Sequence, residues 1–295
     1  MKKIKKVKNG FFERNLSLAK LAFKTGRTLM KSTETLLKDQ ISETVATHSE
    51  NILHEFSMMK GSVLKLGQTL SMFLGDYLPP QIKTMLSSME QNTYFLEWET
   101  IKKQIPVKWF EELTIEEEPF AAASIGQVHL ATHKKTKEKY AVKIQYPGVK
   151  KAIDRDIFTL KLLIASTKII PKNINLDPIY KEVKFMMEQE MDYKKELTHH
   201  DFFSEALAQT DLAKVIEPIH EFCNDRVLTT RYTKGYSARS EEIQNLSQEK
   251  RNELGEKFLH ILYHEIFIWN RMQTDGHLGN YLVELKPKPK WILLD

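Results

Sequence analysis

The segment MQTDGHLGN, residues 272–280, combines an acid and an amide at a spacing that suits phosphate chemistry. Asp275 and Asn280 are five residues apart. In phosphoryl transfer, this spacing places an aspartate beside the acceptor hydroxyl and an asparagine on magnesium. The chain closes with ILLD, so Asp295 adds a second carboxylate, and charged oxygens are the ligands that Mg²⁺ prefers. We therefore predict that Asp275 assists the reaction and that Asn280 and Asp295 hold the metal.

The segment AAASIGQV, residues 121–128, has the outline of a phosphate-covering turn between two strands. Its alanines stand where the G-x-G-x-x-G-x-V pattern has its first two glycines, while Gly126 and Val128 match the pattern. Glycine there lets the backbone approach the phosphates and adopt positive φ, so alanine should change how phosphates sit without removing the cover. A plain β-hairpin turn is the alternative for this segment taken alone. The candidate nucleotide contacts are Ala121, Ala122, Ala123, Ser124 and Val128.

Lys143 lies in the apolar stretch YAVKIQ, the next expected strand. Protein kinases place there the lysine that holds the α and β phosphates. A lysine on an apolar strand needs a partner, because its desolvation is costly when it is unpaired. Glu190, Asp192 and Glu196 are candidate partners, and the last two share a helix face because they are four residues apart. The alternative for these acids is a solvated surface cluster.

The elements that must position these groups follow from the apolar pattern. Residues 10–104 lack strand-like alternation and predict helices, the clearest between residues 51 and 73. LTIEEEPF, SIGQVHLAT and KYAVKIQY then predict three strands of an antiparallel meander. Helices follow from Ile153 and from Asp177, the second with Asp177 as N-cap. The chain continues with strands in AKVIEPI and DRVLTTRY, a helix over residues 254–269, and a final hairpin of NYLVEL and WILLD.

Composition limits the class of protein. The 295 residues are 41% hydrophobic, which is enough for a folded core, and the net charge of +5 is too small to indicate nucleic acid as a partner. Five lysines in MKKIKKVK fit a solvated tail or an anionic membrane surface. The sequence shows no signal peptide and no run of the ~18 apolar residues that cross a bilayer. The single Cys223 fits a reducing compartment, so we expect a cytoplasmic protein that is either free or peripheral to a membrane.

Five segments together resemble the UbiB family of atypical kinases, which is associated with ubiquinone biosynthesis. They are KLGQ at 65–68, AAAS at 121–124, AVK at 141–143, EMDYKKE at 190–196 and TDGHLGN at 274–280. The resemblance covers about residues 50–295. It implies that Lys65 and Gln68 belong to a helical extension that gates the nucleotide site. Lys65 would reach Glu190 and Asp192, leaving Glu196 to orient Lys143.

Several features refine this resemblance. Glu190 and Asp192 cannot face the same way on a regular helix, so we expect a distortion or a helix end there. An alanine turn with an inserted helix disfavours a bulky protein substrate. Gly276 stands where the family commonly has proline, and Arg231 stands in the linker where the family tends to have an acid. Because the chain stops at Asp295, we expect exposed apolar faces on the 254–269 helix and the last hairpin.

These observations predict an α+β, protein-kinase-like fold with an antiparallel-sheet N-lobe. The predicted parts are a basic tail (1–10), a helical extension with the K-x-G-Q motif (11–110), the N-lobe (111–234) and a truncated C-lobe (235–295). We predict an enzyme that binds ATP and Mg²⁺, an atypical kinase or ATPase of isoprenoid quinone metabolism. The alternatives are a nucleotide- or lipid-binding scaffold without turnover and a small-molecule phosphotransferase. Expected partners are the nucleotide, lipid or quinone intermediates and an anionic membrane surface; the sequence does not indicate the oligomeric state.

Overall fold

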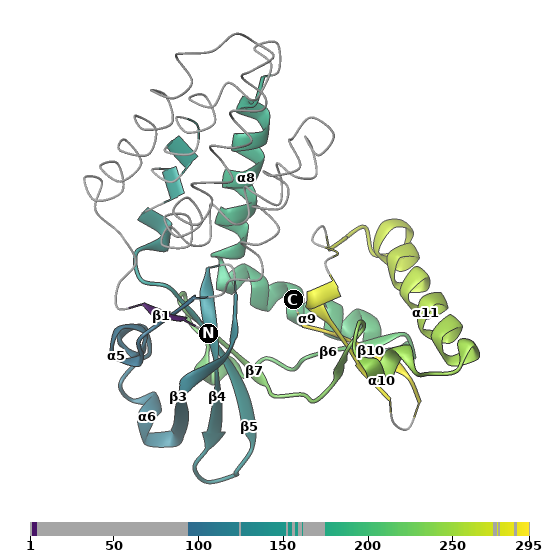
Figure 1. Cartoon of the computed structure of the whole chain (residues 1–295), viewed down its shortest axis with the longest axis horizontal. Coiled ribbons are helices and arrows are strands. Elements are labelled where there is room, and N and C mark those ends of the chain that lie inside the picture. The colour runs from purple at the N-terminus through teal and green to yellow at the C-terminus, as the bar shows by residue number, and fades with distance from the viewer. Residues whose placement is uncertain are drawn as a thin grey trace, which may run out of the picture. The chain divides into compact units, whose positions relative to one another are not determined.

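Strands β3 (Leu113–Ala122), β4 (Gly126–His133) and β5 (Lys139–Gln145) form the predicted meander, and β7 (Val227–Arg231) completes a four-stranded sheet (Figure 1). The order is β3-β4-β5-β7. Alternate side chains of a strand face opposite sides of the sheet, and Tyr140, Val142 and Ile144 of β5 are all buried. The burial of these three side chains explains the apolar pattern of β5 in the sequence.

The computed structural model describes residues 2–4, 94–123, 125–151, 153–154, 157–158, 161, 175–273, 276, 278–285 and 288–294. The expected K-x-G-Q helix therefore lies outside the described residues. The chain divides into two compact units. The first comprises Met1–Pro106, Glu116–His129 and Lys143–Met191, and the second comprises Val107–Ile115, Leu130–Val142 and Asp192–Asp295. The boundaries of the four parts expected from the sequence stay predictions.

A short strand, β2 (Tyr94–Leu96), precedes the large sheet and pairs in parallel with β1 (Lys2–Ile4). The prediction of helices throughout residues 10–104 is therefore wrong at this point. Three residues are too few to show the alternation by which a strand is recognised in a sequence. After β2 come α5 (Trp98–Ile101), the 3₁₀ helix η1 (Lys102–Gln104) and α6 (Trp109–Glu112).

Helical segments join the meander to the C-terminal elements. The described residues between 149 and 161 are helical, and α8 (Asp177–Glu190) and α9 (Tyr193–Ala208) follow. Helix α8 carries Pro178 in its first turn, as predicted. The predicted N-cap is wrong by one residue, because Leu176 caps the helix and Asp177 is its first residue. The Asp177 carboxylate accepts instead from Lys161 Nζ at 2.7 Å.

The C-terminal sheet has the order β6-β10-β9-β8, formed by Ala213–Val215, Lys290–Leu293, Tyr281–Glu284 and Tyr236–Ser237 respectively. Strand β10 is parallel to β6 and antiparallel to β9, so the predicted final hairpin is confirmed. The 3₁₀ helix η2 (His220–Phe222) lies between β6 and β7. Helices α10 (Glu241–Gln244) and α11 (Gln248–Phe267) complete this region. Helix α11 packs on the hairpin, and Trp291 Nε1 donates to the Leu254 carbonyl oxygen at 2.8 Å.

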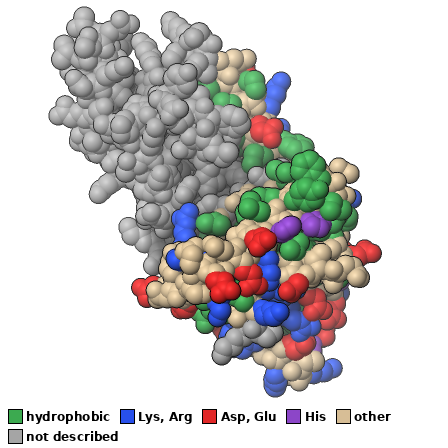
Figure 2. Space-filling model, turned by 90° about the vertical axis from the view of Figure 1, so that its right-hand side faces the viewer, with side chains coloured by type: hydrophobic (Ala, Val, Ile, Leu, Met, Phe, Trp, Pro, Cys, Tyr) green, Lys and Arg blue, Asp and Glu red, His purple; other side chains and the backbone are tan. Residues whose placement is uncertain are grey.

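The outer face of α11 is apolar. Figure 2, which faces the side of the molecule on which α11 lies in Figure 1, shows hydrophobic side chains beside histidines. The exposed apolar residues of α11 are Leu259, Tyr263, Ile266 and Phe267. The expected exposure is thus confirmed for the helix. It is wrong for the hairpin, whose residues Tyr281, Val283 and Ile292 are buried.

No helix among the described residues is both long and apolar enough to cross a membrane.

Candidate nucleotide site

The alanine turn joins β3 to β4. Ala121 and Ala122 end β3, all three alanines are partly buried, and Val128 is partly buried on β4. The Ala123 N–H donates to the Gly126 carbonyl oxygen at 3.0 Å, which closes the turn. Ser124 lies outside the described residues. The segment is therefore a hairpin turn, and the contact of this turn with nucleotide phosphates stays a prediction.

Close packing explains the glycine at residue 126, whereas the sequence predicted that glycine there lets the backbone approach the phosphates. A Cβ atom at this residue would lie 2.4 Å from the Ile144 carbonyl oxygen on β5, well inside van der Waals contact. Gly148 is the glycine with positive φ in the described part of the chain. The Tyr146 N–H also donates to the Ile125 carbonyl oxygen at 2.9 Å. The end of the turn is thus fixed closely against the strand that carries Lys143.

Lys143 is partly buried on β5, between the buried Val142 and Ile144. Two residues further on, the Gln145 amide donates from Nε2 to the Met191 carbonyl oxygen at 2.8 Å in a buried hydrogen bond. Residues i and i+2 of a strand point to the same face of a sheet. The corner at Met191 therefore lies on the face of β5 to which Lys143 points. Gln145 is not among the site residues predicted from the sequence, where its signal is a lone amide in an apolar strand.

The acidic segment forms the corner between two helices. Glu190 is the last residue of α8, Met191 is in a turn, and α9 starts at Tyr193. This confirms the expected helix end between Glu190 and Asp192. Asp192 is the N-cap of α9, and its carboxylate accepts from the Lys195 N–H at 3.1 Å. Part of the Asp192 charge therefore stabilises the helix end, where a carboxylate satisfies backbone donors.

The described structure does not test the pairing of the other predicted partners in this region. Glu196 is partly buried in the first turn of α9, but it belongs to the second unit and Lys143 to the first. Their pairing stays a prediction. Lys65 and Gln68 lie outside the described residues, so their gating role also stays a prediction.

The loop predicted to carry the reaction ends at the 3₁₀ helix η3 (Leu278–Asn280). The Leu294 N–H donates to the Asn280 carbonyl oxygen at 2.9 Å. This bond joins the backbone of one predicted metal ligand to the residue that directly precedes the other, Asp295. Asp275 and Asp295 themselves lie outside the described residues. Gly276 is exposed, and a Cβ there would meet no atom within 4 Å apart from its chain neighbours.

A buried carboxyl lies near the start of this loop. Glu265 of α11 is only 1% exposed, and burial raises its pKa from the ordinary 4.5 to about 7, while the nearby backbone of Gln273 partly offsets the rise. Gln273 in turn accepts a short hydrogen bond from the Tyr281 hydroxyl. Glu265 is not among the residues predicted from the sequence. Its signal was an acid one helical turn after Ile261, within the buried stripe of the helix.

The described residues contain no cluster of three or more His, Cys, Asp or Glu side chains that could hold a metal ion. The predicted magnesium ligands do not form such a cluster, because they are one amide and one carboxylate. The Asn280 amide oxygen and the Asp295 carboxylate are hard oxygen donors, and the chemistry of this donor set fits Mg²⁺.

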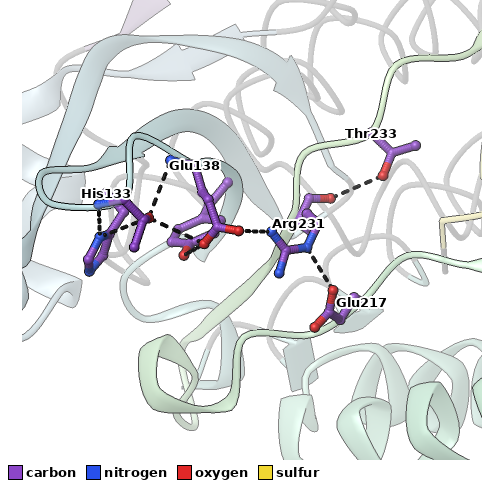
Figure 3. A network of polar contacts seen from close by, with 7 residues as sticks. His133, Glu138, Glu217, Arg231 and Thr233 are labelled. Atoms are coloured by element: carbon purple, nitrogen blue, oxygen red, sulfur yellow. Dashed lines mark hydrogen bonds and ion pairs between the residues drawn. The ribbon is translucent and has the colours of Figure 1, made fainter.

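Arg231 at the end of β7 is held in an ion-pair network (Figure 3). Its guanidinium binds Glu138 through a short contact and Glu217 through Nε at 2.7 Å. The Tyr140 hydroxyl also donates to Glu138 at 3.0 Å. The hydrogen bonds from Arg231 and Tyr140 lower the pKa of the Glu138 carboxyl. The basic side chain that departs from the family pattern is thus occupied by two local acids.

The antiparallel sheet with its lysine strand, followed by helices and a hairpin after an asparagine loop, defines an α+β, protein-kinase-like fold. The chain belongs to the ABC1 atypical kinase-like domain family, whose model matches residues 85–295. The predicted resemblance to UbiB-type atypical kinases is thereby confirmed.

Curated relatives agree with this assignment. The chain is 34% identical to "Atypical kinase coq-8, mitochondrial" of Caenorhabditis elegans, over 84% of this chain and 34% of that protein. It is 31% identical to "Atypical kinase COQ8B, mitochondrial" of Rattus norvegicus, over 80% of this chain and 45% of that protein. The chain thus spans less than half the length of these two relatives.

A solved structure supports the fold. The complex of Rv3197 with erythromycin from Mycobacterium tuberculosis matches 89% of this chain and 66% of its own, with a TM-score of 0.54 and 23% identity. At this identity the likeness concerns the fold alone.

Proposed function

We propose that this chain binds ATP with Mg²⁺ and acts as an atypical kinase or ATPase. The observation that carries the proposal is the hydrogen bond from Gln145 to the Met191 carbonyl oxygen. It brings the corner that follows Glu190 to the face of β5 to which Lys143 points. A lysine on the same strand face as a corner that carries acids would suit the binding of phosphates with a metal.

Each predicted residue has a role in this proposal. Lys143 anchors the α and β phosphates, and Glu196 orients it. Asp275 accepts the proton of the attacking hydroxyl or water, while Asn280 and Asp295 hold the metal. Bound Mg²⁺ would supply charge neutralisation at the phosphate oxygens. Lys65 and Gln68 from the extension, with Glu190 and Asp192, gate the site.

We propose that the chain acts in isoprenoid quinone metabolism, with lipid or quinone intermediates as partners, and that it does not phosphorylate proteins. The family resemblance supports the link to ubiquinone biosynthesis, and an alanine turn with an inserted helix would obstruct a bulky protein acceptor. The lysines of the first eight residues suit an anionic membrane surface. The two curated relatives are named mitochondrial, so the cytoplasmic location expected for this chain stays a prediction.

A scaffold that binds nucleotide without turnover is the second candidate. It is favoured by Gly276, because glycine restricts the backbone of the loop less than the family's proline would. A small-molecule phosphotransferase is the third.

Hydrolysis of ATP with Mg²⁺, measured with and without anionic lipid vesicles, separates these candidates. The proposal predicts turnover that Asp275→Asn reduces by about 10²-fold or more. His220→Gln, at an exposed histidine paired with Asp201, serves as the matched control and should leave turnover unchanged. Binding of ATP without any turnover would support the scaffold. Transfer of phosphate to a hydroxylated small molecule would support the phosphotransferase instead.

A further inference from the structure

Strand β4 carries two completely buried polar side chains, which packing of the strand alone does not require. Gln127 and His129 are each 0% exposed, and as residues i and i+2 they share one face of the strand. The Gln127 amide clamps the backbone of β2: its Oε1 accepts from the Leu96 N–H at 2.9 Å, and its Nε2 donates to the Leu96 carbonyl oxygen at 3.2 Å. The side chain thus pairs with β2 as a neighbouring strand would.

The clamp fixes the proton of His129. Because Leu96 sets the orientation of the Gln127 amide, Nε2 of Gln127 is a donor toward His129 Nε2 at 2.9 Å. His129 Nε2 must therefore accept, and the ring carries its proton on Nδ1. From there it donates to the Glu116 carbonyl oxygen at 2.7 Å. The relay runs from Leu96 through Gln127 and His129 to β3, and every member is satisfied only when the imidazole is neutral.

The surroundings of His129 favour the neutral ring. The Trp98 ring of α5 packs against it at 5.2 Å between centroids. Burial lowers the pKa of His129 below its ordinary 6.5, while the hydrogen bond to Glu116 and the charge of Glu118 on β3 act in the opposite direction. Among the described residues, Glu118 is the charged side chain that acts on the ring; Gln127 and Trp98 are uncharged.

We propose that Gln127 and His129 form a latch that holds Tyr94–Leu96 against β4, and that protonation of His129 opens it. A proton on Nε2 would face the Nε2 donor of Gln127, so the 2.9 Å contact would become donor against donor. Turning the Gln127 amide over does not relieve the conflict, because both of its bonds to Leu96 would then be mismatched. Opening the latch therefore requires β2 to leave β4.

The latch has a consequence for the alanine turn. Gln127 directly follows Gly126, the residue that closes the turn and lies against Ile144. Strand β2 links the N-terminal part of the chain to the sheet. The latch thus connects β2 to the residue that directly follows the alanine turn. This connection does not depend on nucleotide binding.

Hydrogen exchange of the Leu96 amide, corrected for intrinsic rates, tests the proposal on the full chain. The protection factor should be high at about pH 7.5 and fall about tenfold or more as the pH is lowered through the His129 pKa toward about pH 4.5. In His129→Met, the protection of Leu96 should not depend on pH. In Gln127→Leu it should be low throughout. The Tyr146 amide, which donates to Ile125 in the same unit, is the internal control and should keep its protection.

The tautomer of His129 in the unmodified chain, read from its ¹⁵N chemical shifts, provides evidence that needs no variant. The proposal predicts a proton on Nδ1 and none on Nε2 above pH 6.5. An Nε2–H tautomer would overturn it. A Leu96 protection factor that stays constant while His129 titrates would overturn it equally.

Discussion

The side-chain amide of Gln145 donates a buried hydrogen bond of 2.8 Å to the Met191 carbonyl oxygen. Gln145 lies two residues after the predicted phosphate lysine, Lys143, and Met191 lies between the predicted gating acids, Glu190 and Asp192. One amide therefore sets where the acidic corner lies on the lysine strand. It also explains why the corner needs a break between α8 and α9, since a carbonyl inside a continuous helix would be bonded to its own helix.

Replacing Gln145 should disturb both stability and binding. Gln145→Leu leaves the buried Met191 carbonyl oxygen without this donor, which costs about 1–3 kcal/mol in the free energy of unfolding. Because the corner is no longer held, we expect the affinity for MgATP to fall more than stability alone explains. Denaturant unfolding and calorimetric titration measure the two effects. Gln209→Leu, at an exposed residue after α9, is the matched control and should change neither.

The close packing of the alanine turn predicts opposite effects for one chemical change at two glycines. Gly126→Ala would bring a Cβ to 2.4 Å from the Ile144 carbonyl oxygen, so the strands must separate locally. We expect a loss of about 2–4 kcal/mol in unfolding free energy. Gly255 is an exposed residue of α11, and a Cβ there would meet nothing within 4 Å. Gly255→Ala should therefore raise the free energy of unfolding by about 0.5–1 kcal/mol. Equal melting temperatures for the two variants would refute the packing argument.

Glu265 should make the stability of the chain depend on pH. Its pKa is raised in the folded chain from 4.5 to about 7, so the folded state binds more protons than the unfolded state between these values. The stabilisation is complete below about pH 4.5 and is lost as the pH rises to about 7, by up to about 3 kcal/mol. Glu265→Gln, which mimics the protonated carboxyl, should remove this loss and be more stable than the natural chain at pH 7.5.

Thermal unfolding across this pH range measures the effect. Glu249→Gln, at an exposed acid in the first turn of the same helix, is the control and should keep the natural pH dependence. If Glu265→Gln follows the natural chain at every pH, Glu265 is not the responsible group.

The sequence predicted the parts of the fold that have a repeating pattern. The three strands of the meander and the final hairpin are in place because their apolar residues alternate over enough positions to show a period. Strand β2 was missed because Tyr94–Leu96 is only three residues long and is held by a side chain, Gln127, from elsewhere in the chain. Such a tertiary contact leaves no periodic signal.

For the site, residue types and their order could be read from the sequence, whereas the contacts that hold them could not. The break at Glu190 and Asp192 could be predicted, because two residues that must face one way cannot do so on a regular helix. Gln145 and Glu265 could not be assigned, since a single polar residue in an apolar pattern does not reveal its partner. The reason for Gly126 also differs from the expected one, because the space is taken by Ile144.

Direct binding measurements test most simply whether Lys143 anchors the phosphates of bound MgATP. Titration of the full chain with MgATP should give saturable binding, and Lys143→Met should weaken the affinity at least about tenfold through loss of a charge-assisted contact. Lys139→Met, at an exposed lysine on the same strand, should bind as the natural chain does. Equal affinities for the Lys143→Met variant and the natural chain, or no binding by the natural chain, would show that Lys143 does not anchor MgATP.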